Sequence, residues 1–287
     1  MGMPTTKIVS IIVIIAVVAS IALFLRAKSA FFAYHTDTSG ITIIRDVVYV
    51  PGSTNPKHKL DLYLPKGAKN YPLVYFVHGG NWNSGDKNYN EWLTGLYGSI
   101  GVTLAKQGVG VAVANYRLYP EAHIEDMVSD VAAGANFVIA HTSEYGWRSD
   151  IYLMGHSAGG HLVSLPMKDN PPHVSGVIAL SPILDVPAMT ADSKEDFKQS
   201  VIYPIFGTST PEQLRYSPMT YWQHGAPGNL CVIVGGNDDT HIRVRGVALA
   251  HATVIPGYVH TDMVVKIGSH NDLVTPEILK CLQTFTK

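Results

Sequence analysis

Ile151-Tyr-Leu-Met-Gly-His-Ser-Ala-Gly-Gly160 is the most informative segment of the sequence. It is an apolar run, typical of a buried β-strand, that breaks into a glycine-flanked serine, Ser157. A serine held on a strained turn between a strand and a helix brings neighbouring backbone into close contact, so small residues are needed two positions to either side. Gly155 and Gly159 meet this requirement. The stretch therefore predicts a nucleophile elbow with Ser157 as the reactive residue.

Strand and helix patterns alternate on both sides of this elbow. The expected strands are 41–50, 59–64, 73–77, 109–114, 151–155, 174–180, 230–234 and 263–267, and the expected helices are 89–106, 124–141, 161–167, 243–253 and 276–285. The alternation predicts an α/β fold with a mostly parallel central sheet, helices on both faces and two early antiparallel strands at one edge. It also favours the elbow over an ordinary glycine-rich turn.

Composition limits the class of partner. The chain has 287 residues and a formal net charge of -1, without blocks of like charge, so a small or neutral partner is expected and no nucleic acid. Its two cysteines, Cys231 and Cys281, are too few for a disulfide framework, and we interpret both as buried thiols. No Cys or His pair has zinc-ligand spacing and residues 155–160 do not match a dinucleotide-binding pattern, so no metal or cofactor is expected.

An apolar segment near the amino terminus, residues 8–25, is about 18 uncharged residues long, which is about the length that spans a bilayer. It is long for the core of a cleavable signal, and Ala27-Lys28-Ser29 is a poor cleavage site. We therefore predict a single-pass membrane anchor or signal segment within residues 1–30, followed by one domain over residues 31–287. Positive charges on the two sides of the segment nearly balance, and export of the domain is the favoured orientation.

The stretch 181–228 is irregular in pattern and too long to be a plain connection in a compact domain. Its aromatic residues and prolines predict a small lid or insert. The alternative is a packed excursion that does not contact a substrate.

A serine hydroxyl is a weak nucleophile, so it needs a base, an acid that orients the base, and donors for the developing oxyanion. In chains with this elbow, the acid and the histidine follow the serine in that order, at the carboxyl ends of later strands. Strand 230–234 leads into Gly-Gly-Asn-Asp-Asp, so Asp238 is the predicted acid. Asp239 is the alternative, although it fits better as the cap of the next helix. Asp185 is a third candidate, and its other interpretation is shaping the pocket.

Thirteen histidines are present, and only those beyond the acid satisfy the order. Three of these fit poorly, because one is nearly adjacent to the acid, one lies in a helical pattern and one precedes the last expected strand: His241, His251 and His260. His270 follows that strand, residues 263–267, and is therefore the predicted base.

The backbone N–H of Ala158, directly after the nucleophile, is one predicted oxyanion donor. The loop after strand 73–77 supplies the second from Gly79 or Gly80, with Asn81 as a further candidate. We interpret three neighbouring side chains as structural rather than as proton carriers: His78, Trp82 and His156.

Taken together, these motifs resemble those of the α/β-hydrolases, in the esterase/lipase branch with a His-Gly-Gly oxyanion loop. The resemblance covers about residues 41–287 and rests on His-Gly-Gly-Asn-Trp at 78–82, Asn-Tyr-Arg-Leu at 115–118, Gly-His-Ser-Ala-Gly-Gly-His-Leu at 155–162, and the late Asp238 and His270. Within the branch, the segment 155–162 is similar to arylformamidases and to bacterial feruloyl and acetyl-xylan esterases. Segments 60–65 and 151–155, with the membrane segment, are similar to isoprenylcysteine methylesterases.

The resemblance implies a membrane-tethered carboxylic ester hydrolase that acts on short-chain acyl or methyl esters through an acyl-enzyme. Ser157 would attack, His270 would carry the proton and Asp238 would orient the imidazole. Two alternatives stay open: an arylformamidase-type amide hydrolase, and a non-catalytic binding protein with the same fold. The chain departs from hormone-sensitive-lipase relatives at Asn81, where they carry a third glycine.

Overall fold

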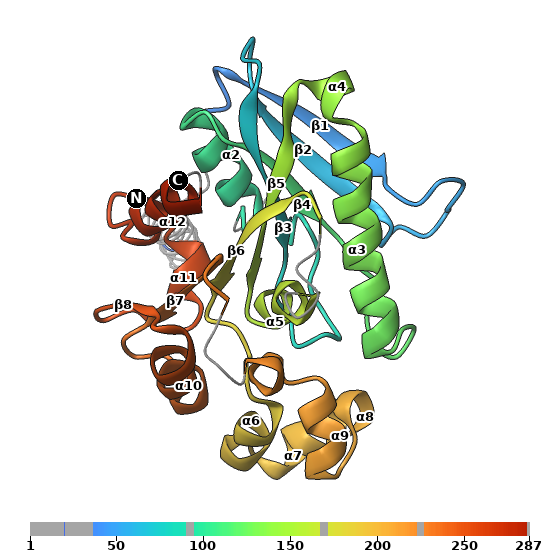
Figure 1. The fold of residues 1–287 in the computed structure, drawn as a ribbon, viewed down its shortest axis with the longest axis vertical. Helices are drawn as coiled ribbons and strands as arrows, with labels where there is room; N and C mark the ends of the chain where they lie inside the picture. The colour runs from blue at the N-terminus through green and yellow to red at the C-terminus, as the bar shows by residue number, and fades with distance from the viewer. Residues whose placement is uncertain (1–19, 21–36, 90–94, 167–171, 223–226, 286–287) are drawn as a thin grey trace, which may run out of the picture.

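The structure, a computed structural model, describes residue 20 and residues 37–89, 95–166, 172–222 and 227–285. Its described strands form one eight-stranded sheet in the order β1-β2-β4-β3-β5-β6-β7-β8 (Figure 1). The strands are β1 (Ile41–Val48), β2 (Lys59–Pro65), β3 (Tyr71–Val77), β4 (Gly110–Ala114), β5 (Trp147–His156), β6 (Val174–Leu180), β7 (Leu230–Gly235) and β8 (Thr253–Ile255). The β1–β2 and β2–β4 pairs are antiparallel and the other pairs are parallel, which confirms the predicted sheet.

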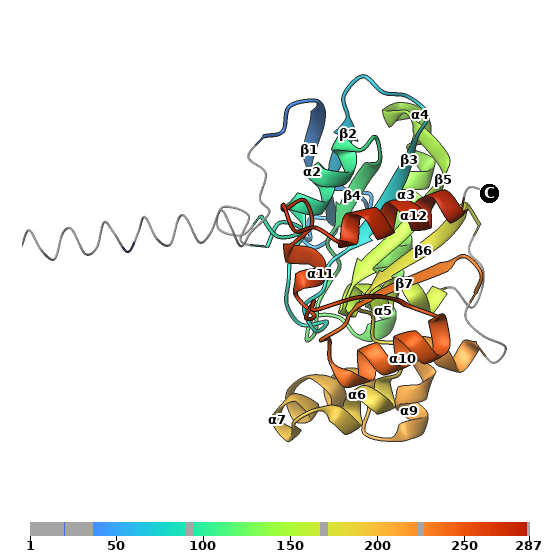
Figure 2. The same ribbon diagram turned by 90° about the vertical axis from the view of Figure 1, so that its left-hand side faces the viewer.

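Helices cover both faces of this sheet (Figures 1 and 2). They are α2 (Gly98–Lys106), α3 (Ile124–Ala140), α4 (Thr142–Tyr145), α5 (Ala158–Ser164), α10 (Thr240–Ala250), α11 (Asp262–Val265) and α12 (Val274–Phe285). Side chains of β3 alternate between the two faces: Leu73 and Tyr75 pack in the core cluster that contains residues of α3 and α5, whereas Val74 and Phe76 pack with α2 and α12. Burial on both faces explains why this strand is apolar at nearly every position.

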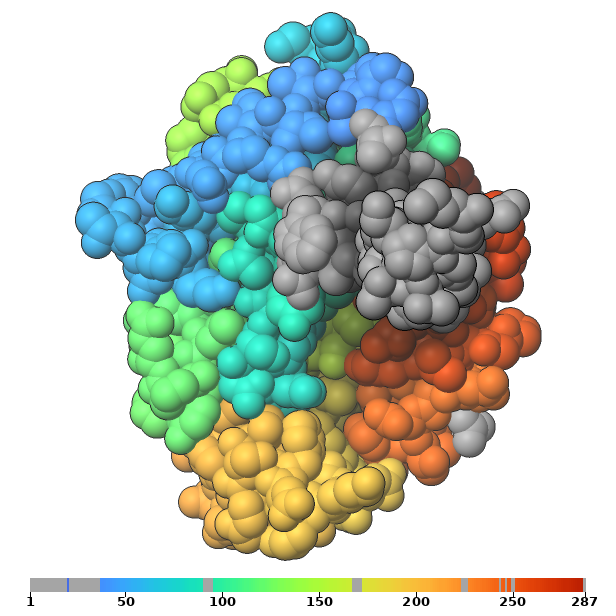
Figure 3. Space-filling view, turned by 180° about the vertical axis from the view of Figure 1, so that it is seen from behind, coloured from blue at the N-terminus to red at the C-terminus, as the bar shows by residue number. Residues whose placement is uncertain are grey.

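The described part of the stretch 181–228 consists mainly of short helices. It contains α6 (Val186–Asp192), α7 (Glu195–Phe197), η2 (Lys198–Ile202), α8 (Tyr203–Phe206), α9 (Thr210–Arg215) and η3 (Pro218–Tyr221). Each helix is too short to give a periodic pattern over several turns, which is why the sequence indicated only an irregular region. These helices form one end of the molecule, with α10 beside them (Figure 3). We call residues 181–222 the insert.

The expected last strand, 263–267, is wrong. Residues 262–265 form helix α11, and the buried residues Met263, Val264 and Ile267 have the spacing of one helical turn rather than of an alternating strand. The sheet instead ends with β8, which has three residues and gives almost no pattern in the sequence.

The predicted membrane helix, residues 8–25, lies outside the described residues except for Ser20. Among the helices that the structure does describe, none is long and apolar enough to cross a membrane. The anchor stays a prediction.

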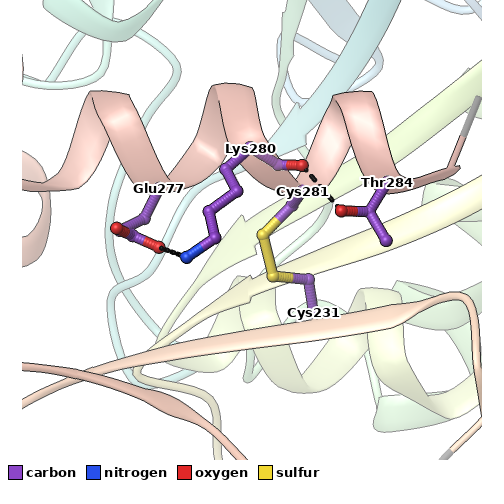
Figure 4. Close-up of a disulfide and its surroundings, with 5 residues drawn as sticks. All are labelled: Cys231, Glu277, Lys280, Cys281 and Thr284. Atoms are coloured by element: carbon purple, nitrogen blue, oxygen red, sulfur yellow. Dashed lines mark hydrogen bonds and ion pairs between the residues drawn. A yellow bond between two sulfur atoms is a disulfide. The ribbon is translucent and has the colours of Figure 1, made fainter.

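A disulfide joins Cys231 in β7 to Cys281 in α12, with 6.1 Å between the Cα atoms (Figure 4). The interpretation of both cysteines as thiols is therefore wrong. The pairing depends on α12 packing across β7, and the two cysteines are 50 residues apart in the chain, so neither local pattern could indicate it. The bond fixes α12 to β7, the strand that leads to Asp238.

Removing this disulfide should destabilise the domain. Replacing both cysteines by alanine should lower the free energy of unfolding by about 2–5 kcal/mol, because the cross-link restricts the unfolded chain. Urea unfolding of the wild type and of the Cys231→Ala/Cys281→Ala variant measures the difference. Dithiothreitol should lower the free energy of unfolding of the wild type by a similar amount and leave that of the double variant unchanged. Equal stability of the two proteins without reductant would contradict the prediction.

Candidate active site

Ser157 lies on a strained turn between β5 and α5. Its φ and ψ angles are 55° and -119°, in a region that residues with a side chain rarely adopt. A Cβ atom on Gly155 would collide with the carbonyl oxygen of Gly159, and one on Gly159 would collide with that of Val77. The turn therefore has the geometry predicted for a nucleophile elbow, and both flanking glycines are required by close backbone contacts.

Asp238 follows β7 and is buried, with three hydrogen bonds to its carboxylate. His260 Nδ1 lies 2.9 Å from Oδ1, the backbone N–H of Asp239 donates to the same oxygen at 2.8 Å, and the Ser181 hydroxyl donates to Oδ2. Burial alone would raise the pKa of Asp238, but the hydrogen bonds from His260, Ser181 and Asp239 outweigh burial and lower it. The acid is therefore held as a carboxylate.

His260, and not His270, contacts this acid. His260 lies in the segment between β8 and α11, whereas His270 follows α11 and is exposed. The predicted placement of His270 beside Asp238 is wrong because the segment 263–267 is not a strand. The last described strand is β8, and the histidine that follows it is His260. The acid is the predicted Asp238, whereas β8 and His260 stand where the segment 263–267 and His270 were expected.

The acid fixes the tautomer of His260. A carboxylate can only accept, so Nδ1 carries the proton that it donates to Asp238, and in the neutral ring the lone pair lies on Nε2. His260 and Ser157 line the same cavity, which has a volume of about 690 Å³. The arrangement places a serine hydroxyl and an imidazole oriented by a carboxylate around one space large enough for a small molecule.

Walls of this cavity come from the insert and from α10. The insert contributes the apolar side chains Ile183, Met189 and Phe197, and the start of α10 contributes Thr240, His241 and Ile242. Asp185, the third candidate acid, is not beside His260: it accepts from the backbone N–H of Ala188 at 3.0 Å and pairs with Arg245 at 2.8 Å. This ion pair holds α6 against α10, so Asp185 helps to shape the pocket.

Hydrogen bonds in the structure reduce the list of candidate oxyanion donors. The backbone N–H of Gly79 donates to the Tyr97 hydroxyl at 3.1 Å, so the predicted role of Gly79 as a donor does not fit. Within the described residues, the N–H groups of Gly80 and Ala158 have no protein acceptor. Gly79 instead packs directly on the nucleophile, because a Cβ placed on it would lie 3.2 Å from Ser157 Cβ.

Trp82 braces the loop after β3 that contains Gly79 and Gly80, which we call the glycine loop, as the sequence indicated. It does so through His161, a residue that the sequence analysis did not single out. Its indole N–H donates to His161 Nδ1 at 3.2 Å, and His161 Nε2 donates to the carbonyl oxygen of Tyr216 in the insert at 2.6 Å. Burial lowers the pKa of His161 to about 4, so the ring is neutral and can accept at one nitrogen while it donates at the other. His161 therefore links the glycine loop, α5 and the insert.

His78 is likewise structural in its surroundings. Its ring stacks on Tyr116 with 4.6 Å between centroids, its Nδ1 donates to the carbonyl oxygen of Gly79 at 2.6 Å, and burial lowers its pKa to about 4. The interpretation of His78 as a brace for the loop agrees with these contacts.

Asp238, Asp239 and His260 are close enough to be considered as metal ligands, because one ligand atom of each lies within 4.8 Å of the others. Both oxygens of Asp238 already accept hydrogen bonds, from Ser181 to one and from Asp239 and His260 to the other. This hydrogen-bonded arrangement fits an acid–base pair better than an open set of metal ligands.

The chain is similar in sequence to known proteins. The BD-FAE family model matches residues 60–252, more than half of the chain. A protein of Arabidopsis thaliana described as a probable isoprenylcysteine alpha-carbonyl methylesterase is 42% identical over 123 residues, which are 42% of this chain and 24% of that protein. The kynurenine formamidase of Danio rerio is 25% identical over 263 residues, which are 84% of this chain and 83% of that protein. The chain thus spans about a quarter of the length of the plant relative.

Solved structures of esterases have the same fold. A truncated carbohydrate esterase from gut microbiota superposes with a TM-score of 0.69 and 20% identity, covering 88% of this chain and 99% of that one. Esterase B from Lactobacillus rhamnosis superposes with a TM-score of 0.66 and 21% identity, covering 95% of this chain and 94% of that one. At these identities the likeness concerns the fold alone.

The surroundings of Asp238 predict how stability depends on pH. Because its pKa is lowered on folding, the carboxylate stabilises the fold above the unfolded value of about 3.9, and this contribution is lost as the pH falls through the folded pKa. The wild type should therefore have a higher free energy of unfolding than Asp238→Asn, and this difference should be larger near neutral pH than near pH 3. Urea unfolding at both pH values measures the two gaps, and gaps of equal size would overturn the prediction.

Proposed function

Because the chain belongs to the BD-FAE family and has an esterase-type α/β-hydrolase fold, we propose that it is a serine carboxylesterase whose triad is Ser157, His260 and Asp238. One observation carries the assignment: His260, paired with a buried carboxylate, lines the same cavity as the serine of the elbow. In this proposal His260, rather than the predicted His270, is the base. The intact set of three residues argues against a non-catalytic binding protein.

The proposed reaction proceeds through an acyl-enzyme. His260 Nε2 takes the hydroxyl proton of Ser157 as Oγ attacks the ester carbonyl, and Asp238 stabilises the imidazolium that forms. The N–H groups of Ala158 and Gly80 are the proposed donors to the tetrahedral oxyanion. His260 then gives its proton to the leaving alkoxide, and water, activated by the same nitrogen, releases the acid and restores Ser157.

Esters of short acyl groups and methyl esters are the proposed substrates. The plant relative described as a methylesterase supports the methyl ester, and the cavity of about 690 Å³ can hold a small molecule. A formamide is the second candidate, supported by the kynurenine formamidase that aligns with 84% of this chain. Both reactions pass through attack of a serine on an acyl carbon, so the same residues serve either one.

We further propose that the domain is exported and tethered by residues 8–25. The disulfide between Cys231 and Cys281 supports export, since such bonds persist mainly in oxidising compartments.

His260 and His270 offer a matched test of the triad. Ser157→Ala and His260→Ala should each lower kcat for p-nitrophenyl acetate by about 1,000-fold or more, because each removes a residue that acts directly on the reacting atoms. His270→Ala should stay within about twofold of the wild type, as expected of an exposed side chain outside the site. Loss of activity in the His270 variant with full activity in the His260 variant would restore the sequence-based assignment.

Substrate class can be settled by direct comparison. The methylesterase proposal predicts a higher kcat/KM for acetyl and methyl esters than for N-formylkynurenine, each measured with wild type and with Ser157→Ala as the blank. A preference for N-formylkynurenine would select the formamidase alternative.

Protease protection in sealed vesicles tests the proposed topology of the full chain. Protection of the domain from protease added on the cytoplasmic side agrees with export, and complete digestion contradicts it.

A further inference from the structure

His156, the residue before the nucleophile, makes two contacts with His260. It is buried at the end of β5, with 4% of its surface exposed. Its ring packs against that of His260 with 4.8 Å between centroids, and its Nε2 lies 3.1 Å from the backbone carbonyl oxygen of His260. A residue adjacent to the nucleophile in sequence therefore contacts a histidine 104 positions later in the chain.

The hydrogen bond has a defined direction. A carbonyl oxygen only accepts, so the proton of the His156 ring lies on Nε2 and is donated to His260. Burial, with a smaller effect of His260, lowers the pKa of His156 to about 3, so the ring is neutral. A neutral neighbour does not repel the imidazolium that forms on His260 during the proposed reaction.

The contact fixes His260 at a second point. Asp238 holds the ring of His260 through Nδ1, and His156 holds the main chain of His260 through its carbonyl oxygen. The residues just before His260 are tied to the end of β7 by the backbone bond from Asn237 to Tyr258, at 2.8 Å. His260 itself sits between β8 and α11, in a segment without regular structure, so its ring position depends on such local bonds.

Packing alone does not account for a histidine here. An apolar side chain could fill the same volume without the cost of burying a polar ring. His156 Nδ1 is buried and has no hydrogen-bond partner among the described residues, so the ring is kept despite one unsatisfied nitrogen. The group that gains from its presence is the carbonyl oxygen of His260.

We propose that His156 is a positioning residue, which holds the backbone of His260 so that its Nε2 stays aligned with Ser157. The inference rests on the proposed function, since it assigns His260 as the base. His156 does not touch the reacting atoms and carries no proton in the reaction.

Two substitutions separate positioning from packing. In His156→Gln the amide nitrogen can occupy the place of Nε2 and keep the donor, whereas His156→Leu fills the space without a donor. We expect His156→Leu to lower kcat for p-nitrophenyl acetate by about 10- to 100-fold with KM changed by less than about twofold, since misplacing a catalytic group costs this much. His156→Gln should retain kcat within about threefold.

Stability is measured alongside, by urea unfolding of each variant. Equal losses of kcat in the two variants, or losses that appear only in KM, would show that the residue serves packing and overturn the proposal. If His156→Leu does not fold, His156→Asn replaces it, because its shorter amide cannot reach the carbonyl oxygen; full activity of His156→Asn would equally overturn it.

His260→Ala, assayed in parallel, keeps this test apart from that of the triad. If His260→Ala is active, the proposed function itself is contradicted. If His260→Ala is inactive and His156→Leu is fully active, only the positioning role of His156 is contradicted.

Discussion

The strained backbone of Ser157 depends on direct contact between backbone segments that leave no room for side chains. Gly159 lies against the carbonyl oxygen of Val77 at the end of β3, and Gly79 lies against Ser157 itself. Strain of this kind costs about 1–3 kcal/mol and persists only where the surrounding structure fixes it. The central strands β3 and β5, which are buried on both faces, fix this backbone, so the core sets the position of Ser157 relative to the glycine loop.

Around this fixed point the polar groups are arranged by burial and hydrogen bonding. Burial keeps His78, His156 and His161 neutral, and each uses its ring N–H on a backbone carbonyl: one in the glycine loop, one on His260 and one in the insert. Asp238 is the exception that stays charged, because three donors outweigh its burial. The result is a buried carboxylate that orients the His260 ring, while three neutral histidines hold the glycine loop, the His260 backbone and the insert in place.

How well the sequence predicts each part of this site depends on how far apart in the chain the interacting residues lie. The elbow and Asp238 were predictable because local pattern and chain direction place both at the carboxyl ends of buried strands. His260 was missed because its assignment depends on β8, which is three residues long, and on α11, whose apolar run resembles a strand. The disulfide was missed because it depends on the packing of two elements whose cysteines are 50 residues apart in the chain. The hydrogen bond from Gly79 to the Tyr97 hydroxyl was missed because no local pattern indicates which side chain packs against the glycine loop.

The proposed function requires that Ser157 is a nucleophile activated by His260. Reaction with an alkyl fluorophosphonate, followed by proteolysis and mass spectrometry, tests this requirement, because the adduct records the residue that attacked. One adduct is expected, on Ser157, which forms at the same rate in His270→Ala and is lost or greatly slowed in His260→Ala. An adduct on another residue, or undiminished labelling of Ser157 in His260→Ala, would contradict it.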